Sequence, residues 1–259
     1  MRVETLVLGY HAVSPAWRAP TSVTPAAFDA QIGTLIANGW APATLVDALT
    51  APEAERTFAV TFDDAHLSVL EHAAPILARH GAPATVFVPT DYAEQGTLMG
   101  WDGYDVWLGT DAEEELRCLT WERLRELDGR GWEIASHTCS HPRLTKIDDA
   151  QLERELTRSR ELCEERIGSA CHSIAYPYSD VDDRVARAAR KAGYGIGVTV
   201  PRGHAAALPL LWPRVGVYHG EDARRMQLRI WRRRHAQLDA ALAPAARAAR
   251  RAVAALPGR

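Results

Sequence analysis

The stretch FAVTFDD, residues 58–64, indicates the fold class, because a continuous run of apolar and β-forming residues ends in two adjacent acids. A strand that is apolar on both faces is typical of a parallel sheet covered on either side by helices. A helical pattern follows this run, and the same strand-then-helix unit recurs along the chain. Strands are predicted at residues 3–9, 56–62, 84–88, 132–136, 173–176, 195–200 and 214–217, and helices at 24–38, 66–80, 120–127, 150–167 and 183–192.

The number of these units predicts an α/β protein with a barrel-like closure rather than a small open sheet. The chain has 259 residues, of which 47% are apolar, enough for a substantial core. We expect a main domain at residues 1–220 and an Arg-rich helical extension at 221–259, where residues 223–259 contain ten Arg and one acid. A helix predicted at 222–243 has Trp231, His235, Leu238 and Leu242 on one face, and we expect it to dock on the acidic body of the protein. Its basic side is also suited to weak peripheral contact with anionic lipid.

Composition excludes several classes of protein. The formal net charge of −3 argues against a strongly basic nucleic-acid binder and against an acidic disordered chain. The four cysteines form no CxxC pair and are expected to be free thiols. No stretch approaches the roughly 20 apolar residues that span a bilayer, and the apolar run near the N-terminus is too short for a signal peptide. We therefore expect a cytoplasmic protein with no nucleic-acid partner; the sequence indicates no oligomeric state.

Polar residues follow four of the predicted strands, where active sites of α/β proteins lie. These are His11, the pair Asp63-Asp64, the two histidines of His137-Thr138-Cys139-Ser140-His141, and Tyr178 in Tyr176-Pro177-Tyr178. Two imidazoles and one carboxylate make a three-ligand site with an open position, as in zinc hydrolases. Successive side chains of a strand point in different directions, so one of the two acids binds the metal and the other faces the water.

Other interpretations of the same residues stay open at this point. The acidic pair alone fits a strand that runs into an Asx-turn, and the two histidines alone fit a loop that caps a helix. Two histidines and a carboxylate also serve non-haem iron oxygenases, although those ligands are usually close in sequence on an all-β scaffold. Besides a zinc hydrolase and an iron oxygenase, a catalytically silent carbohydrate-binding domain is a further possibility.

Taken together, three motifs resemble the NodB-homology polysaccharide deacetylases of carbohydrate esterase family 4. They are Thr61-Phe62-Asp63-Asp64, His137-Thr138-x-x-His141 and Tyr176-Pro177-Tyr178, within a resemblance that covers about residues 6–217. The resemblance implies a distorted (β/α) barrel, and makes residues 1–220 the deacetylase catalytic domain. It further implies one divalent metal, expected to be zinc with cobalt, nickel, manganese or iron as alternatives, held by Asp64, His137 and His141, with Asp63 as the base.

The sequence departs from this family pattern in three places. The usual glycines after the acidic pair and after Pro-Tyr are Ala65 and Ser179. The Arg that commonly precedes the third motif's Pro is replaced by Ala175, so Arg214 is predicted to support the base. The late Leu-x-His motif that supplies the acid is missing near the C-terminus.

The missing acid has a candidate at the other end of the chain. A branch of the family looks circularly permuted, and Leu8-Gly9-Tyr10-His11 fits that arrangement, which makes His11 the predicted acid. We expect it to lie on the side of the site opposite Asp63. The backbone N–H of Tyr178 is the predicted donor to the oxyanion.

These features predict hydrolysis of an N-acyl amide, in the first place N-acetyl, on an amino sugar or glycoconjugate. A deformylase or imide-type amidase acting on a small molecule that is not a sugar is the alternative. The partner would be an amino-sugar-containing small molecule or glycan. Long loops on a barrel rim usually carry function, and the loop at 100–110, with Trp101, Tyr104 and Trp107, is the predicted substrate-specific wall.

Overall fold

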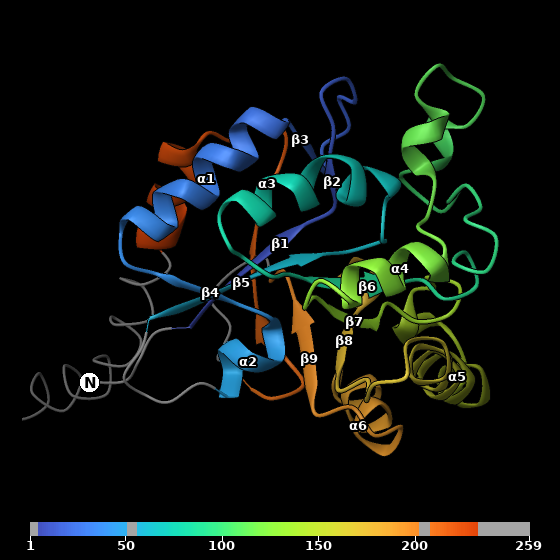
Figure 1. Cartoon of the computed structure of the whole chain (residues 1–259). Coiled ribbons are helices and arrows are strands. Elements are labelled where there is room, and N and C mark those ends of the chain that lie inside the picture. The colour runs from blue at the N-terminus through green and yellow to red at the C-terminus, as the bar shows by residue number, and fades with distance from the viewer. Residues whose placement is uncertain (1–4, 51–55, 202–207, 233–259) are drawn as a thin grey trace, which may run out of the picture.

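The computed structural model describes residues 5–50, 56–201 and 208–232 and shows parallel strands surrounded by helices (Figure 1). The strands of the main sheet are β1 (Thr5–Tyr10), β4 (Ala41–Ala43), β5 (Thr57–Phe62), β6 (Thr85–Val88), β7 (Glu133–Ser136), β8 (Ser173–Ala175), β9 (Ile196–Thr199), β10 (Trp212–Pro213) and β11 (Val215–Gly216). A separate small sheet pairs β2 (Ala12–Val13) with β3 (Ser22–Val23).

Helices lie on the outside of the main sheet (Figure 1). The α-helices are α1 (Pro25–Ala37), α2 (Leu45–Thr50), α3 (Ala74–Arg79), α4 (Trp121–Asp128), α5 (Asp149–Ile167) and α6 (Asp183–Lys191). A π-helical turn, η1 (Val69–Ala73), precedes α3, and short 3-10 turns are η2 (Asp105–Trp107), η3 (Glu113–Leu116), η4 (Leu144–Lys146) and η5 (Pro177–Ser179). The side chains of Thr24, Thr120, Asp148 and Asp182 cap the N-termini of α1, α4, α5 and α6.

The main sheet is a nearly closed barrel, which confirms the predicted fold. Its strand order is β10-β9-β8-β7-β6-β5-β1-β11, with β4 also paired to β5, and the pairs are parallel. The segment at 212–216 closes the ring, because β10 pairs with β9 and β11 pairs with β1. The predicted strand at 214–217 is therefore two short strands on either side of Arg214, whose N–H donates to the Thr199 carbonyl at 2.7 Å.

The strands alternate between an inner and an outer face, as the pleat requires. The odd-numbered positions of β1 and β5 face the barrel interior, where a small apolar cluster is plugged by α2. This cluster contains Val7, Leu45, Ala48, Ala59, Phe87, Ala135, Ala175 and Val198. The even-numbered positions, such as Leu8 and Phe58, join the larger core beneath the helices. The alternation carries Asp63 and His11 to the inner rim of the barrel.

Some predicted boundaries were wrong. The helix predicted at 66–80 begins one residue later, with helical residues at 67–68 before η1, because Asp64 and Ala65 adopt left-handed backbone angles (φ 69° and 53°) and His66 pairs with Cys118 in an isolated bridge. The sequence patterns gave no indication of β2, β3, β4, α2 or β10, which are too short to show a period. All four cysteines are buried free thiols, as predicted.

The predicted C-terminal helix begins as expected, with helical residues at 223–232. It packs through Met226 and Ile230, whereas Trp231 is 53% exposed, so the prediction of an inward Trp231 was wrong. Met226 sets which face of the helix points inward, because its sulfur lies 3.7 Å from the hydroxyl of the buried Tyr10. Residues 233–259 lie outside the described residues, and the division at 220 stays a prediction. Among the described residues, no helix has both the length and the hydropathy to cross a membrane.

Candidate active site

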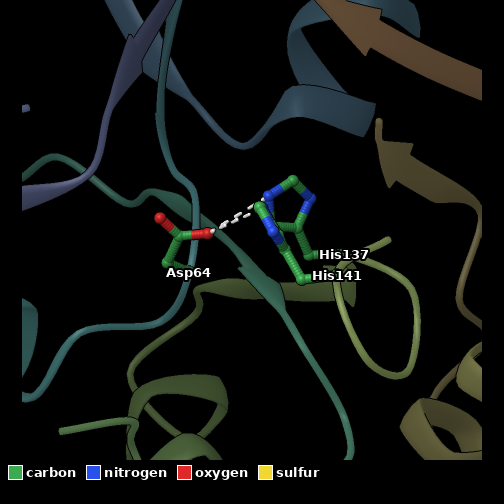
Figure 2. A group of neighbouring side chains, drawn as sticks. All are labelled: Asp64, His137 and His141. Atoms are coloured by element: carbon green, nitrogen blue, oxygen red, sulfur yellow. Dashed lines mark ion pairs between the residues drawn. The ribbon is translucent and has the colours of Figure 1, made fainter. Parts of the chain in front are cut away.

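Asp64, His137 and His141 meet at the carboxyl ends of β5 and β7. Their ligand atoms lie within 4.8 Å of one another, and together they form a group that could hold a metal ion. Asp64 Oδ1 is 3.3 Å from His137 Nε2 and 3.5 Å from His141 Nε2 (Figure 2). All three side chains are buried. The structure thus brings together the three predicted metal ligands.

The donor set fits a divalent cation. Asp64 Oδ1 is buried without a hydrogen-bond partner in the described structure, which is costly for a carboxylate oxygen unless a cation meets it. The Nδ1–H of His137 donates to the Ala175 carbonyl at 2.8 Å, which leaves Nε2 as the ligating nitrogen. Mixed imidazole and carboxylate donors suit zinc and related transition metals.

The two histidines differ in the direction in which their pKa is shifted. Burial lowers the pKa of His141 to about 3, so this ring is neutral and one of its two nitrogens carries a lone pair. Burial also disfavours charge on His137, but the carboxylates of Asp64 and Asp63 outweigh it and raise the pKa of His137. A proton and a cation therefore compete for Nε2 of His137.

Asp63 is paired with Arg214. The sequence predicted that Arg214 would supply the positive charge that the family's third motif usually provides, because Ala175 replaces that arginine here. Two parallel hydrogen bonds of 2.6 Å join the guanidinium to both carboxylate oxygens, and a third joins it to Thr61 Oγ1 at 2.9 Å. Burial would raise the pKa of Asp63, but Arg214 more than compensates and holds this pKa below its usual value. Asp63 is therefore ionised, and it lies beside the candidate metal ligands.

His11 lies in the same site but not where it was expected. Its Nε2 is 3.9 Å from Asp63 Oδ2, so the two groups are neighbours rather than opposite one another. The physical reason is register: Tyr10 pairs with Phe62 across β1 and β5, which places the next residues of both strands side by side at the rim. Burial lowers the pKa of His11, although the carboxylates of Asp64 and Asp63 oppose that effect.

Backbone strain is concentrated in the three motifs. Six described non-glycine residues have positive φ, and all of them lie in these segments: Asp64, Ala65, Thr138, His141, Tyr178 and Ser179. Such backbone angles are costly and persist at functional sites, where surrounding contacts enforce them. Ala65 and Ser179 adopt a left-handed conformation although the usual glycine is absent at both positions. Tyr178, at φ 56°, forms the sharp turn expected of the third motif.

Aromatic side chains flank His141. The ring of Trp101 stacks on it with centroids 3.9 Å apart, and Tyr178 meets it edge-on at 4.7 Å. Arg143 lies over the ring of Tyr178, with its guanidinium carbon 4.0 Å from the ring centroid, and pairs with Asp102. The sequence patterns did not predict that the loop at 100–110 would contact the candidate ligands, because nothing in the sequence fixes its path.

The sequence at 50–197, more than half of the chain, matches the polysaccharide deacetylase family. The chain belongs to this family. The matched residues contain the acidic pair, both ligand histidines and Tyr178 of this polysaccharide deacetylase domain. They do not contain His11 or Arg214, and the circular permutation of the acid motif stays a prediction.

Individual relatives agree with this assignment. The Bacillus subtilis protein YxkH is 28% identical over 207 residues, covering 77% of this chain and 66% of its own length. The Staphylococcus aureus poly-β-1,6-N-acetyl-D-glucosamine N-deacetylase is 24% identical over 155 residues, covering 56% of this chain and 48% of its own length. The chain therefore spans about half to two thirds of these curated relatives. The solved Streptococcus pyogenes deacetylase PplD has the same fold, with a TM-score of 0.74, 24% identity and coverage of 88% of this chain and 98% of PplD.

Proposed function

We propose that this chain is a metal-dependent N-deacetylase acting on an N-acetylated amino sugar within a glycan. The observation that carries the proposal is the unpartnered Asp64 Oδ1, which faces two imidazole nitrogens beside the Arg-paired carboxylate of Asp63. A binding domain has no need of an ionised base next to a cation site. Family membership and the named activity of the Staphylococcus aureus relative support the choice of an N-acetyl group on a sugar.

Asp64, His137 and His141 would hold the ion, which we propose to be zinc. A divalent ion supplies a Lewis acid that polarises the acyl carbonyl and acidifies a water. Asp63 accepts the proton from that water, and Arg214 keeps Asp63 ionised until it does so. The backbone N–H of Tyr178 donates to the oxygen on which negative charge develops. The buried position of the ligands excludes bulk water and strengthens each of these interactions.

His11 completes the reaction by protonating the departing amine. Its lowered pKa leaves it neutral at rest, so it must first acquire a proton. The 3.9 Å separation from Asp63 Oδ2 supports transfer of the proton taken from water to His11 Nε2, and from there to the amine nitrogen. Water supplies both the hydroxyl that stays on the acyl carbon and the proton that leaves with the amine, which balances the hydrolysis.

The test is acetate release by purified protein loaded with Zn²⁺, from poly-β-1,6-N-acetylglucosamine, N-acetylglucosamine oligosaccharides and a panel of small formamides. We expect acetate from at least one sugar and about 10²- to 10⁴-fold slower release by Asp63→Asn. Formate release without acetate would replace this function by the deformylase alternative. Absence of both products, with the metal bound, would indicate a binding domain.

The proposed function also concerns the partner of the protein and its location. A glycan or an amino-sugar-containing small molecule is the proposed partner, and the cytoplasmic location and the weak membrane contact of the C-terminal helix stay predictions. Fractionation with quantification of the protein in each compartment tests the location directly.

A further inference from the structure

The second oxygen of Asp64 is held by a buried tyrosine. The Tyr104 hydroxyl donates to Asp64 Oδ2 at 2.7 Å, and it lies 2.9 Å from His66 Nε2. His66 is in turn fixed on its other side, where Nδ1–H donates to the Glu115 carbonyl at 2.8 Å. Tyr104 is 6% exposed and His66 is fully buried. A continuous chain of hydrogen bonds thus runs from the backbone of η3 to the carboxylate of Asp64.

This chain makes the two oxygens of Asp64 unequal. Oδ2 is occupied by Tyr104, whereas Oδ1 has no hydrogen-bond partner and faces His137 and His141. Without the tyrosine the carboxylate could rotate about its terminal bond and lose this orientation. Hydrogen bonds to the free atom of a metal ligand fix its orientation and raise metal affinity.

The turn that carries Tyr104 also contacts a second candidate ligand. Trp101 stacks on His141, and the Tyr104 N–H donates to the Trp101 carbonyl at 2.8 Å, so one short turn contacts both. Trp17 packs edge-on against Tyr104 at 5.7 Å and also contacts His66, which closes the far side of the tyrosine. The turn is therefore held on three sides, and the hydroxyl has little freedom to leave Asp64.

We infer that Tyr104 and His66 are positioning residues that orient Asp64 for a divalent cation, and that the turn at 101–104 belongs to the metal centre. The inference rests on the proposed metal site and adds residues that lie outside the three motifs. It assigns Tyr104 a role different from the substrate-specific wall predicted for its loop.

The test is the Kd for Zn²⁺, measured by competition with a chromophoric chelator in the full chain, with circular dichroism as a check on folding. We expect Tyr104→Phe to raise this Kd by about 10- to 100-fold, and excess Zn²⁺ to restore turnover. The matched control is Tyr10→Phe, which removes another buried hydroxyl, bonded to Gln31 at 2.9 Å, and should leave the Kd unchanged. Equal Kd values for Tyr104→Phe and the wild type would overturn the inference.

Two variants of His66 test the inference without changing Tyr104. His66→Leu should raise the Kd because Tyr104 loses its anchor, and His66→Gln, which keeps a donor and an acceptor, should restore most of the affinity. Identical Kd values for the two His66 variants would contradict the inference. If the wild type itself binds no Zn²⁺, the proposed metal centre fails, and this result is distinct from a failure confined to Tyr104 and His66.

Discussion

Two adjacent carboxylates acquire different tasks because their surroundings differ. Arg214 occupies both oxygens of Asp63, whereas Asp64 keeps one oxygen without a hydrogen-bond partner and turned toward two imidazoles. The side chain of Asp63 points in the direction set by strand alternation. The backbone of Asp64 is left-handed, and this turns the Asp64 side chain in a different direction. The first acid is therefore suited to accept a proton and the second to bind a cation.

This division predicts opposite results for two isosteric variants. Asp63→Asn should lower turnover by about 10²- to 10⁴-fold, the range for one general base, and retain one equivalent of zinc. Asp64→Asn should lose the zinc, because an amide oxygen carries no charge to meet the ion. Metal content by atomic absorption together with acetate release checks both, and exchanged outcomes would mean that base and ligand are reversed.

The position of His11 beside Asp63 predicts how its loss affects amide and ester substrates. His11→Ala should lower turnover of an N-acetyl amide by about 10²- to 10⁴-fold. An acetate ester should lose less activity, because an alkoxide leaves with less help from an acid than an amine does. Parallel rate measurements on the two substrates decide the point, and an equal loss on both would assign the proton to another group.

At the amino end of β7, one carboxylate joins several elements of the barrel. Glu133, at the start of β7, accepts hydrogen bonds from Ser173 of β8 at 2.6 Å, from Thr85 of β6 at 2.9 Å and from the Val46 N–H of α2 at 3.0 Å. Burial raises the pKa of Glu133, and these hydrogen bonds only partly offset that effect. The carboxylate thus connects three strands and the helix that plugs the interior.

The raised pKa makes a prediction about stability and pH. The unfolded chain ionises Glu133 near its ordinary value of about 4.3, and the folded chain ionises it only at higher pH. The contribution of Glu133 is therefore largest below the unfolded pKa and is lost as pH rises through the folded pKa. Urea midpoints of Glu133→Gln should fall less than those of the wild type as pH increases through this window. The control Glu122→Gln, at an exposed position on α4, should follow the wild type.

For the whole molecule, the candidate metal site joins distant parts of the chain. Its ligands come from the ends of β5 and β7, the base is paired with Arg214 at the closure of the barrel, and Tyr104 comes from the long loop before α4. A ligand that binds such a site in the folded state alone stabilises the fold by mass action. Metal binding and global stability should therefore be linked.

Addition of Zn²⁺ at a free concentration of one hundred times its Kd should stabilise the protein by about 2.7 kcal/mol. For a domain of this size that corresponds to a rise of about 5–10 °C in Tm. Calorimetry with and without the chelator EDTA measures the difference, and His141→Ala should abolish it. An equal Tm with and without zinc in the wild type would contradict a single native metal site.

The order of the longer strands and helices, the barrel class and the residues at the strand ends could be predicted from the sequence, because these depend on local periodicity and capping. Thr24, Thr120, Asp148 and Asp182 are local signals, and each caps the helix that follows it. The resemblance of the motifs to the deacetylase family implied Asp64, His137 and His141 as the ligands, and the structure brings these three side chains together.

Which groups face one another across the barrel depends instead on the tertiary structure. The 3.9 Å approach of His11 to Asp63 depends on the register of β1 against β5, and the contact of Arg214 with Asp63 depends on ring closure at 212–216. Tyr104 and His66 were not identified from the sequence because a loop without periodicity carries no signal of where it packs. Long-range contacts of this kind result from the packing of the whole barrel, and no local pattern contains them.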